Sequence, residues 1–126
     1  MMRKEIHTEK APAALGPYSQ AIEAGDFIYV SGQIGINPET GDVAEGIEAQ
    51  TKQVMHNLQE ILTEAKSDLS QVVKFTIYID SMDNFATVNE IYGSYLTKPY
   101  PARATVEVSR LPKSVLIEMD AVVYKK

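Results

Sequence analysis

The sequence predicts an α+β domain in which two helices pack on one face of a mixed β-sheet. Several segments alternate between apolar and polar residues, as half-buried strands do, and two others have helical periodicity. Each helical segment offers only one apolar stripe, so both helices can be buried against the same face of a sheet. The length of 126 residues suits one hydrophobic core, which predicts a single domain over residues 1–126.

The first part of the chain has the pattern of a β-hairpin. Residues 17–24 and 27–34 read as two strands joined at Gly25-Asp26. Because side chains alternate along a strand, the second strand should present two different faces. Its faces would carry Phe27, Tyr29 and Ser31 on one side, and Ile28, Val30 and Gly32 on the other. A run of turn-forming residues at 37–42 then ends the hairpin.

Two amphipathic helices are predicted. From residue 46 to about residue 66, apolar residues recur at helical spacings with no interrupting Gly or Pro. A second helical face runs over residues 85–96. Ser81 or Asp83 is available as its N-cap, and Pro99 ends it because proline cannot continue a helix.

Three further strands complete the predicted sheet, at residues 73–80, 102–109 and 115–124. In the first, apolar residues alternate strictly from Val73 to Ile79. In the other two we expect the uniformly apolar sets to lie under the helices. These sets are Ala104, Val106 and Val108 in one strand, and Val115, Ile117, Met119, Ala121 and Val123 in the other.

The opposite face of the last two strands mixes charged and apolar side chains. It would carry Arg103, Thr105, Glu107, Leu116, Glu118, Asp120, Val122 and Tyr124. A solvated face seldom has so many aromatic and branched side chains, so we expect another subunit to cover it and leave the charged residues in a cleft between chains. The alternative is an exposed face with ordinary cross-strand ion pairs.

Composition excludes several kinds of chemistry. The chain has no cysteine, and its two histidines, His7 and His56, lie far apart, so we expect no thiol nucleophile and no metal site. A formal net charge of -5 argues against a nucleic-acid partner. No apolar run is long enough for a membrane span and no secretory signal begins the chain, so we expect a cytoplasmic protein.

Arg103 is the strongest candidate for chemistry. It follows two prolines, and its planar guanidinium matches a carboxylate better than lysine does. A structural salt bridge to Glu107 or Glu118 is the alternative. Asp120 would share its face and could activate a water, or simply neutralise Arg103. Asn89 would face the core and brace the second helix through its buried amide.

Six motifs occur in order along almost the whole chain: GPYSQA at 16–21, SGQI at 31–34, VNEIYG at 88–93, PARATVEV at 101–108, RLPK at 110–113 and IEM at 117–119. Together they resemble the Rid (YjgF-type) family of reactive intermediate deaminases. The resemblance implies a fold like that of chorismate mutase and a homotrimer with a cleft at each subunit interface. It also implies hydrolysis of 2-imino acids, such as 2-iminopropanoate (from 2-aminoacrylate) and 2-iminobutanoate, to 2-oxo acids and ammonia without metal or cofactor.

The resemblance also implies roles for particular residues. Arg103 would bind the substrate carboxylate, and Asp120 would stand at the position of the family's water-activating acid. The pocket would also be lined by Tyr18, Ser31, Gly32, Asn89 and Thr105. Two residues depart from the usual pattern, because the family commonly has Glu at the position of Asp120 and Cys at that of Thr105.

A second class of function stays open, because a fold does not determine function. The same pocket could bind a small 2-oxo acid without turnover, in an accessory protein of a regulator or chaperone. Chorismate mutase activity is disfavoured, since three arginines offer little positive charge for a dicarboxylate substrate. Replacing Asp120 by Asn separates enzyme from sensor, because only an enzyme would lose rate with little change in binding.

Overall fold

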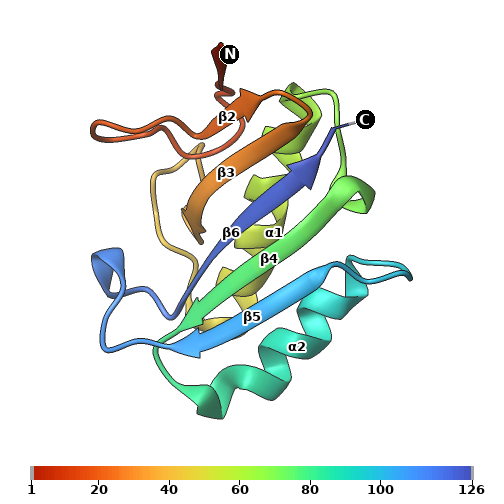
Figure 1. Cartoon of the computed structure of the whole chain (residues 1–126). Helices are drawn as coiled ribbons and strands as arrows, with labels where there is room; N and C mark the ends of the chain where they lie inside the picture. The colour runs from red at the N-terminus through yellow and green to blue at the C-terminus, as the bar shows by residue number, and fades with distance from the viewer. Residues whose placement is uncertain (1, 126) are drawn as a thin grey trace.

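The computed structural model describes residues 2–125 and has one six-stranded sheet in the order β1-β2-β3-β6-β4-β5. Its strands are β1 (Arg3–Ile6), β2 (Ala21–Ala24), β3 (Phe27–Ile34), β4 (Val72–Ile79), β5 (Ala102–Glu107) and β6 (Ile117–Tyr124), and its helices are α1 (Gly46–Glu64) and α2 (Phe85–Ser94). Strands β4 and β5 are parallel and all other neighbours are antiparallel. Figure 1 looks onto the sheet with α1 behind it. The predicted mixed sheet with two helices is confirmed.

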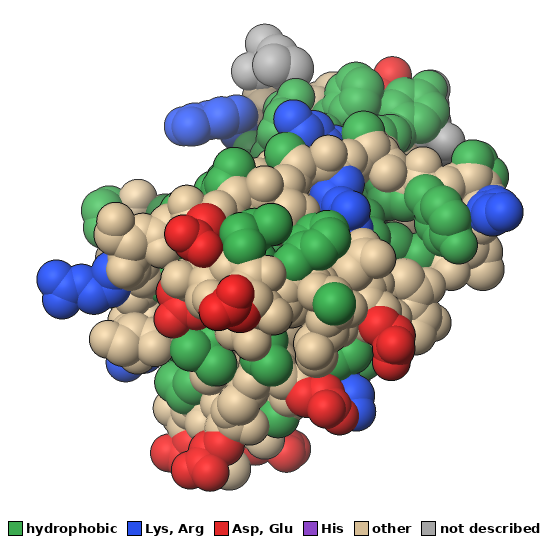
Figure 2. All heavy atoms as spheres, turned by 90° about the horizontal axis from the view of Figure 1, so that it is seen from below, with side chains coloured by type: hydrophobic (Ala, Val, Ile, Leu, Met, Phe, Trp, Pro, Cys, Tyr) green, Lys and Arg blue, Asp and Glu red, His purple; other side chains and the backbone are tan. Residues whose placement is uncertain are grey.

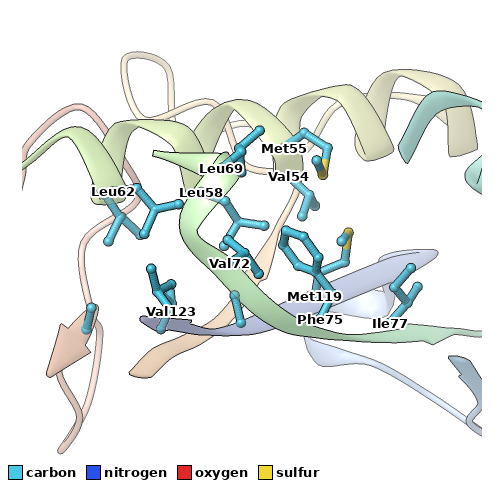
Figure 3. Close-up of a cluster of buried hydrophobic side chains, with 14 of the residues drawn as sticks. Val54, Met55, Leu58, Leu62, Leu69, Val72, Phe75, Ile77, Met119 and Val123 are labelled. Atoms are coloured by element: carbon cyan, nitrogen blue, oxygen red, sulfur yellow. The ribbon is translucent and has the colours of Figure 1, made fainter. Parts of the chain in front are cut away.

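The core fills the space between the helices and the sheet. Leu58 and Leu62 of α1 point toward Phe75 of β4 and Val123 of β6, and all four side chains are buried (Figure 3). Burying side chains of this size is the main source of stability, and truncating one to alanine costs about 2–5 kcal/mol. Neither described helix is long and apolar enough to cross a membrane.

The β2–β3 hairpin is confirmed, with Gly25 at φ 63° in its turn. Its first strand is shorter than predicted and begins at Ala21. Strand β1, which pairs with β2 at the edge of the sheet, lies outside the residue ranges that the sequence predicts as strands. Its residues Arg3, Lys4 and Glu5 are exposed, and such a charged edge strand lacks the alternation that identifies a strand in a sequence.

Two β-bulges change the predicted face of residues in β3 and β4. A bulge between Val30 and Gln33 breaks the alternation, so Gln33 faces the core while Gly32 lies on the open face beside Glu118. The prediction that Gly32 shares the face of Ile28 and Val30 is therefore wrong. A second bulge, at Val73, leaves that side chain 42% exposed and puts Val72 into the core in its place.

The predicted faces of β5 are also wrong. Arg103, Thr105 and Glu107 lie opposite the buried residues of β4 in a parallel pair, so they point to the helix side of the sheet. The backbone N–H of Met82, just before α2, donates to Glu107 Oε1 at 2.8 Å, as this orientation requires. Strand β5 lies at the edge of the sheet, where neither of its faces is fully buried. The pattern of apolar residues in β5 therefore does not indicate which face packs against the helices.

The open face of the sheet has apolar side chains at its surface. Phe27 and Tyr124 lie with their rings 5.4 Å apart, and Tyr29 and Val106 are also exposed there. Figure 2 looks from below, at 90° to the view onto the sheet, and shows hydrophobic side chains among acidic and basic ones on that side of the molecule as well. Exposed aromatic and branched side chains on a sheet face are typical of a surface that binds another protein surface.

Candidate functional site

Arg103 lies in a hollow between α2 and the start of β5. Its guanidinium carbon is 5.2 Å from the ring centre of Tyr92 and 5.4 Å from that of Phe85, and its Nη1 donates to Asn89 Oδ1. We call this hollow the arginine pocket; it is lined by Asn89, Tyr92, Gly93, Tyr100, Pro101 and Arg103. Two aromatic rings and one amide therefore fix the orientation of the guanidinium and leave donors on its exposed side.

Arg103 makes no ion pair among residues 2–125. The alternatives in which Glu107 or Glu118 forms a salt bridge with it, or Asp120 neutralises it, are therefore not observed. A positioned guanidinium without an acidic partner is suited to bind an anion from outside the chain. Its planar fork matches a carboxylate in particular.

Asn89 differs from its predicted position. Its side chain is exposed, and Val88, one residue earlier on α2, points into the core. The prediction that Asn89 braces the helix from the core is wrong, because one residue corresponds to a rotation of about 100° around a helix. The Asn89 side chain orients Arg103 instead, by accepting a hydrogen bond from it.

A second group of predicted residues lies at the other end of the sheet, around Ser31. Tyr18 and Ser31 line one groove, which we call the serine groove, together with Arg3, Pro17, Ser19, Ile22, Tyr29 and Val30. Ser31 Oγ donates to the carbonyl of Ser19, and Ser31 N donates to that of Gln20. These two bonds hold the segment that presents Tyr18 against β3.

The side chain of Gln20 holds the chain before Tyr18 in place. Its buried amide accepts from Thr8 N at 2.7 Å and donates to the carbonyls of Thr8 and Pro12. A buried amide with both ends satisfied stabilises one loop conformation, because an alternative loop would leave it without partners. Tyr18 is therefore exposed on a segment that is well anchored.

Glu118 lies against Gly32, one residue beyond Ser31 of the serine groove. The sequence suggests it only as a salt-bridge partner of Arg103. The Glu118 side chain is half-buried on the open face of β6 and lies over Gly32. A Cβ atom at Gly32 would collide with Glu118 Oε2 and lie 2.9 Å from Cδ. Burial raises the pKa of Glu118, and the nearby Asp120 carboxylate raises it further. A raised pKa is what a carboxyl group needs to exchange protons near neutral pH.

Asp120 lies two residues along the same face of β6. Its Oδ2 accepts a hydrogen bond of 3.0 Å from the hydroxyl of Tyr78 on β4. Burial, the hydrogen bond to Asp120 and the charge of Asp120 together raise the pKa of Tyr78, so this hydroxyl stays protonated and can keep donating. Because Asp120 is on the open face and Arg103 on the helix side, the prediction that they share a face is wrong.

Thr105 lies two residues after Arg103, on the same side of β5. Its Oγ1 is buried and has no hydrogen-bond partner among the described residues. Such a hydroxyl is uncommon in a folded protein, since desolvation without a partner costs about 1–3 kcal/mol. The predicted pocket residue is thus next to the arginine pocket, although it does not line it.

One chain therefore presents two separate groups of candidate residues, which we call half-sites. One contains Arg103 and Asn89, beside Thr105, and the other contains Tyr18 and Ser31, with Gly32, Glu118 and Asp120 nearby. Strand β4 lies between β5 and β6, and the half-sites are on opposite faces of the sheet. Among residues 2–125 no three His, Asp or Glu side chains are grouped as metal ligands.

Comparisons with known proteins agree with the motifs. A family model described as "Endoribonuclease L-PSP" matches residues 8–125. A RutC family protein of Pyrococcus abyssi is 54% identical over 127 residues, covering 100% of both chains. The 2-iminobutanoate/2-iminopropanoate deaminase of Salmonella typhimurium is 42% identical and covers 99% of this chain and 100% of its own.

Solved structures are similar over nearly the whole chain. The structure of Escherichia coli TdcF with bound serine has a TM-score of 0.94 and 34% identity, and the match covers 98% of this chain and 99% of that one. The ligand in that structure is a small amino acid. The fold that carries the two half-sites is therefore shared with a protein that binds such a molecule.

Proposed function

The chain belongs to the Rid (YjgF-type) family, and from this premise we propose that it hydrolyses small 2-imino acids to 2-oxo acids and ammonia. The proposed substrates are 2-iminopropanoate, which arises from 2-aminoacrylate, and 2-iminobutanoate. Relatives that are 42–46% identical have names that state this activity. The single observation that carries the proposal within the chain is the positioned guanidinium of Arg103, which makes no ion pair among residues 2–125.

Arg103 binds the substrate in this proposal. Its exposed donors form a bidentate pair with the carboxylate, and that pair fixes the position of the adjacent imine carbon. The aromatic rings of Phe85 and Tyr92 lie against the guanidinium and hold it in one orientation. A 2-imino acid is already electrophilic, so orientation and a well-placed water can supply much of the catalysis.

We assign the proton transfers to Glu118. Its carboxylate accepts a proton from a water while the water oxygen attacks the carbon of the protonated imine. Glu118 then gives that proton to the carbinolamine nitrogen and becomes a carboxylate again. The C–N bond breaks, ammonia leaves, and the hydroxyl passes its proton to the Glu118 carboxylate as the C=O bond forms. Asp120, the acid predicted from the resemblance, stays the alternative, because only its Oδ2 accepts from Tyr78; Glu118 is favoured here because it is half-buried with a raised pKa.

The proposed enzyme is a homotrimer whose sites lie between subunits. Each half-site is incomplete, because Arg103 and Glu118 lie on opposite faces of one chain. A neighbouring subunit placed on the apolar open face would bury Phe27, Tyr29 and Val106 and bring its own arginine pocket to Glu118. The trimer and a cytoplasmic location stay predictions.

The decisive experiment generates the imine in place. A serine or threonine dehydratase supplies 2-aminoacrylate or its four-carbon homologue, and loss of the imine is followed by its ultraviolet absorbance. The proposal requires faster loss with wild-type protein than with buffer, and no acceleration with Arg103→Ala. Wild-type protein that binds a 2-oxo acid but does not accelerate the loss would instead support the accessory role.

A further inference from the structure

We propose that Gly93 of α2 determines how large a substrate side chain the arginine pocket accepts, and that the pocket therefore also admits 2-imino acids with apolar side chains larger than an ethyl group. The inference rests on the proposed function for the reaction and names a substrate class of that same site. Gly93 lines the arginine pocket together with Asn89 and Arg103. Binding of the substrate carboxylate by Arg103 does not explain why this residue is a glycine.

The backbone of α2 does not require a glycine at position 93. The residue lies in the last turn of the helix, which ends at Ser94 and is followed by Tyr95 with φ -92°. Gly93 is not one of the described glycines with a positive φ, so it is not a left-handed cap of the helix. A glycine with helical backbone angles makes a helix less stable than alanine would. Local structure alone would therefore favour a residue with a side chain.

Packing within the chain does not require a glycine either. Apart from its chain neighbours and the surrounding helix backbone, a Cβ atom at Gly93 would have no described atom within 4 Å. At Gly35, by contrast, a Cβ atom would lie 2.9 Å from the backbone of Gln50. A close approach thus explains Gly35 but not Gly93, and the space beside Gly93 is open.

This open space lies next to the group that binds the carboxylate. Gly93 is four residues after Asn89, whose side chain accepts a hydrogen bond from Arg103. Residues four apart lie on the same face of a helix, and each Cα–Cβ bond tilts toward the N-terminus of the helix. A side chain at position 93 would therefore extend toward Asn89 and the guanidinium. Its absence leaves room beside a substrate whose carboxylate pairs with Arg103.

The walls of this space suit an apolar group. Besides Gly93, they are formed by Tyr92, whose side chain is buried, and by Tyr100 and Pro101. Arg103 is the one charged residue that lines the pocket in the described part of the chain. The pocket has a volume of about 430 Å³, within the range of roughly 300–1,000 Å³ for pockets that hold drug-sized ligands. A three-carbon imino acid leaves much of it empty, whereas a branched or aromatic side chain would bury apolar surface there.

Variants that fill the space test the inference. Imines of alanine, leucine and phenylalanine are generated in place by an L-amino-acid oxidase, and we expect wild-type protein to hydrolyse all three. Gly93→Leu should lower kcat/KM for the two larger imines about tenfold more than for the imine of alanine, with a smaller change in the same direction for Gly93→Ala. Ala86→Leu, at an exposed position of α2 outside both half-sites, is the matched control and should leave these ratios unchanged.

Binding of the 2-oxo acid products gives the same comparison without turnover. Titration calorimetry with pyruvate and phenylpyruvate should show that Gly93→Leu weakens the binding of phenylpyruvate about tenfold more than that of pyruvate. If wild-type protein hydrolyses no imine, the proposed function fails, and this titration still decides whether Gly93 limits the size of the side chain.

Two results would overturn the inference. One is a wild-type protein that hydrolyses the imine of alanine but rejects those of leucine and phenylalanine. The other is an equal loss for small and large ligands in Gly93→Leu, which would mean that the position contacts a neighbouring subunit or supports the helix. Native mass spectrometry of each variant shows whether assembly is unchanged. If Gly93→Leu assembles differently from wild type, the ratios of Gly93→Ala, which adds one methyl group, decide the question.

Discussion

Arg103 and Glu118 lie on opposite faces of the same sheet, with β4 between their strands. Adjacent strands are about 4.8 Å apart, so two strand spacings alone separate the backbones of these residues by roughly 10 Å. Glu118 also lies three residues along β6 from Ala121, the residue in line with Arg103 through Phe75, which increases the separation. A substrate as small as a three- or four-carbon imino acid does not span that distance within one chain. The pairing of these residues in one active site therefore requires two chains.

Mixed oligomers test this requirement directly. Arg103→Ala and Glu118→Gln should each be inactive alone, because each destroys one half of every site. After the two variants exchange subunits in equal amounts, random assortment gives about one intact site in four, so activity should return to about a quarter of wild type. The measurement is the dehydratase-coupled assay before and after exchange. A mixture that stays inactive, although mass spectrometry shows mixed trimers, would mean that one chain supplies both residues.

The shape of the guanidinium should matter as well as its charge. Arg103→Lys keeps the positive charge but loses the bidentate fork and the flat contact with Tyr92. We expect kcat/KM to fall at least tenfold, which corresponds to about 1.4 kcal/mol. Arg110→Lys, at an exposed position outside both half-sites, is the matched control and should retain wild-type kinetics. Equal activity of the two lysine variants would remove Arg103 from substrate binding.

We expect Asn89 to affect substrate binding by orienting the guanidinium of Arg103. Asn89→Ala loses the acceptor that orients the guanidinium, whereas Asn89→Asp supplies a carboxylate that pairs with it and competes with the substrate. We expect KM to rise in both variants and to rise more in Asn89→Asp, by about tenfold or more, as salt-bridge competition would predict. Steady-state kinetics give the comparison. A larger rise in KM for Asn89→Ala than for Asn89→Asp would show that Asn89 contacts the substrate itself.

More of the fold than of the candidate site could be predicted from the sequence. Periodicity identified α1, α2 and the inner face of β6, because those segments bury a continuous apolar surface. It misplaced Gly32 and Val73, since a bulge reverses the alternation without leaving a clear signal in the sequence. It also assigned Arg103 to the wrong face, because β5 is an edge strand whose apolar residues stay partly exposed.

The same errors kept the sequence from indicating the role that we propose for Glu118. With Gly32 assigned to the core, nothing in the sequence connected that glycine to a carboxylate on another strand. The useful signal is the combination of a glycine in a strand with a long acidic residue on its antiparallel neighbour, which indicates a close approach that a Cβ would prevent. For Asp120 the sequence allows either activation of a water or neutralisation of Arg103, and the resemblance favours the first. The structure adds the contacts of the two acids, with Tyr78 for Asp120 and with Gly32 for Glu118.

Gly32→Ala tests the close approach of Glu118. The added Cβ occupies the place of the Glu118 carboxylate, and that carboxylate is the far end of a flexible side chain that can swing aside. The fold should therefore lose little stability, while kcat falls by about tenfold or more because the base is displaced. Thermal unfolding and steady-state kinetics on the same sample separate the two effects. A large drop in melting temperature with unchanged kcat would mean that Gly32 has a purely structural role.

Glu118 should destabilise the fold at neutral pH, as functional acids often do. Its pKa is raised on folding, so above the unfolded pKa the folded state binds more protons than the unfolded state, and stability falls as pH rises through that window. Glu118→Gln removes this effect and should raise Tm at pH 7 by on the order of 2 °C, a small value because the side chain is only half-buried. The gain should vanish near pH 3, where Glu118 is protonated in both states.

Calorimetry at pH 7 and at pH 3 makes the comparison. Glu64→Gln, at an exposed position at the end of α1, is the matched control. A Tm gain that is equal at both pH values would show that the substitution acts through packing rather than through the charge of Glu118.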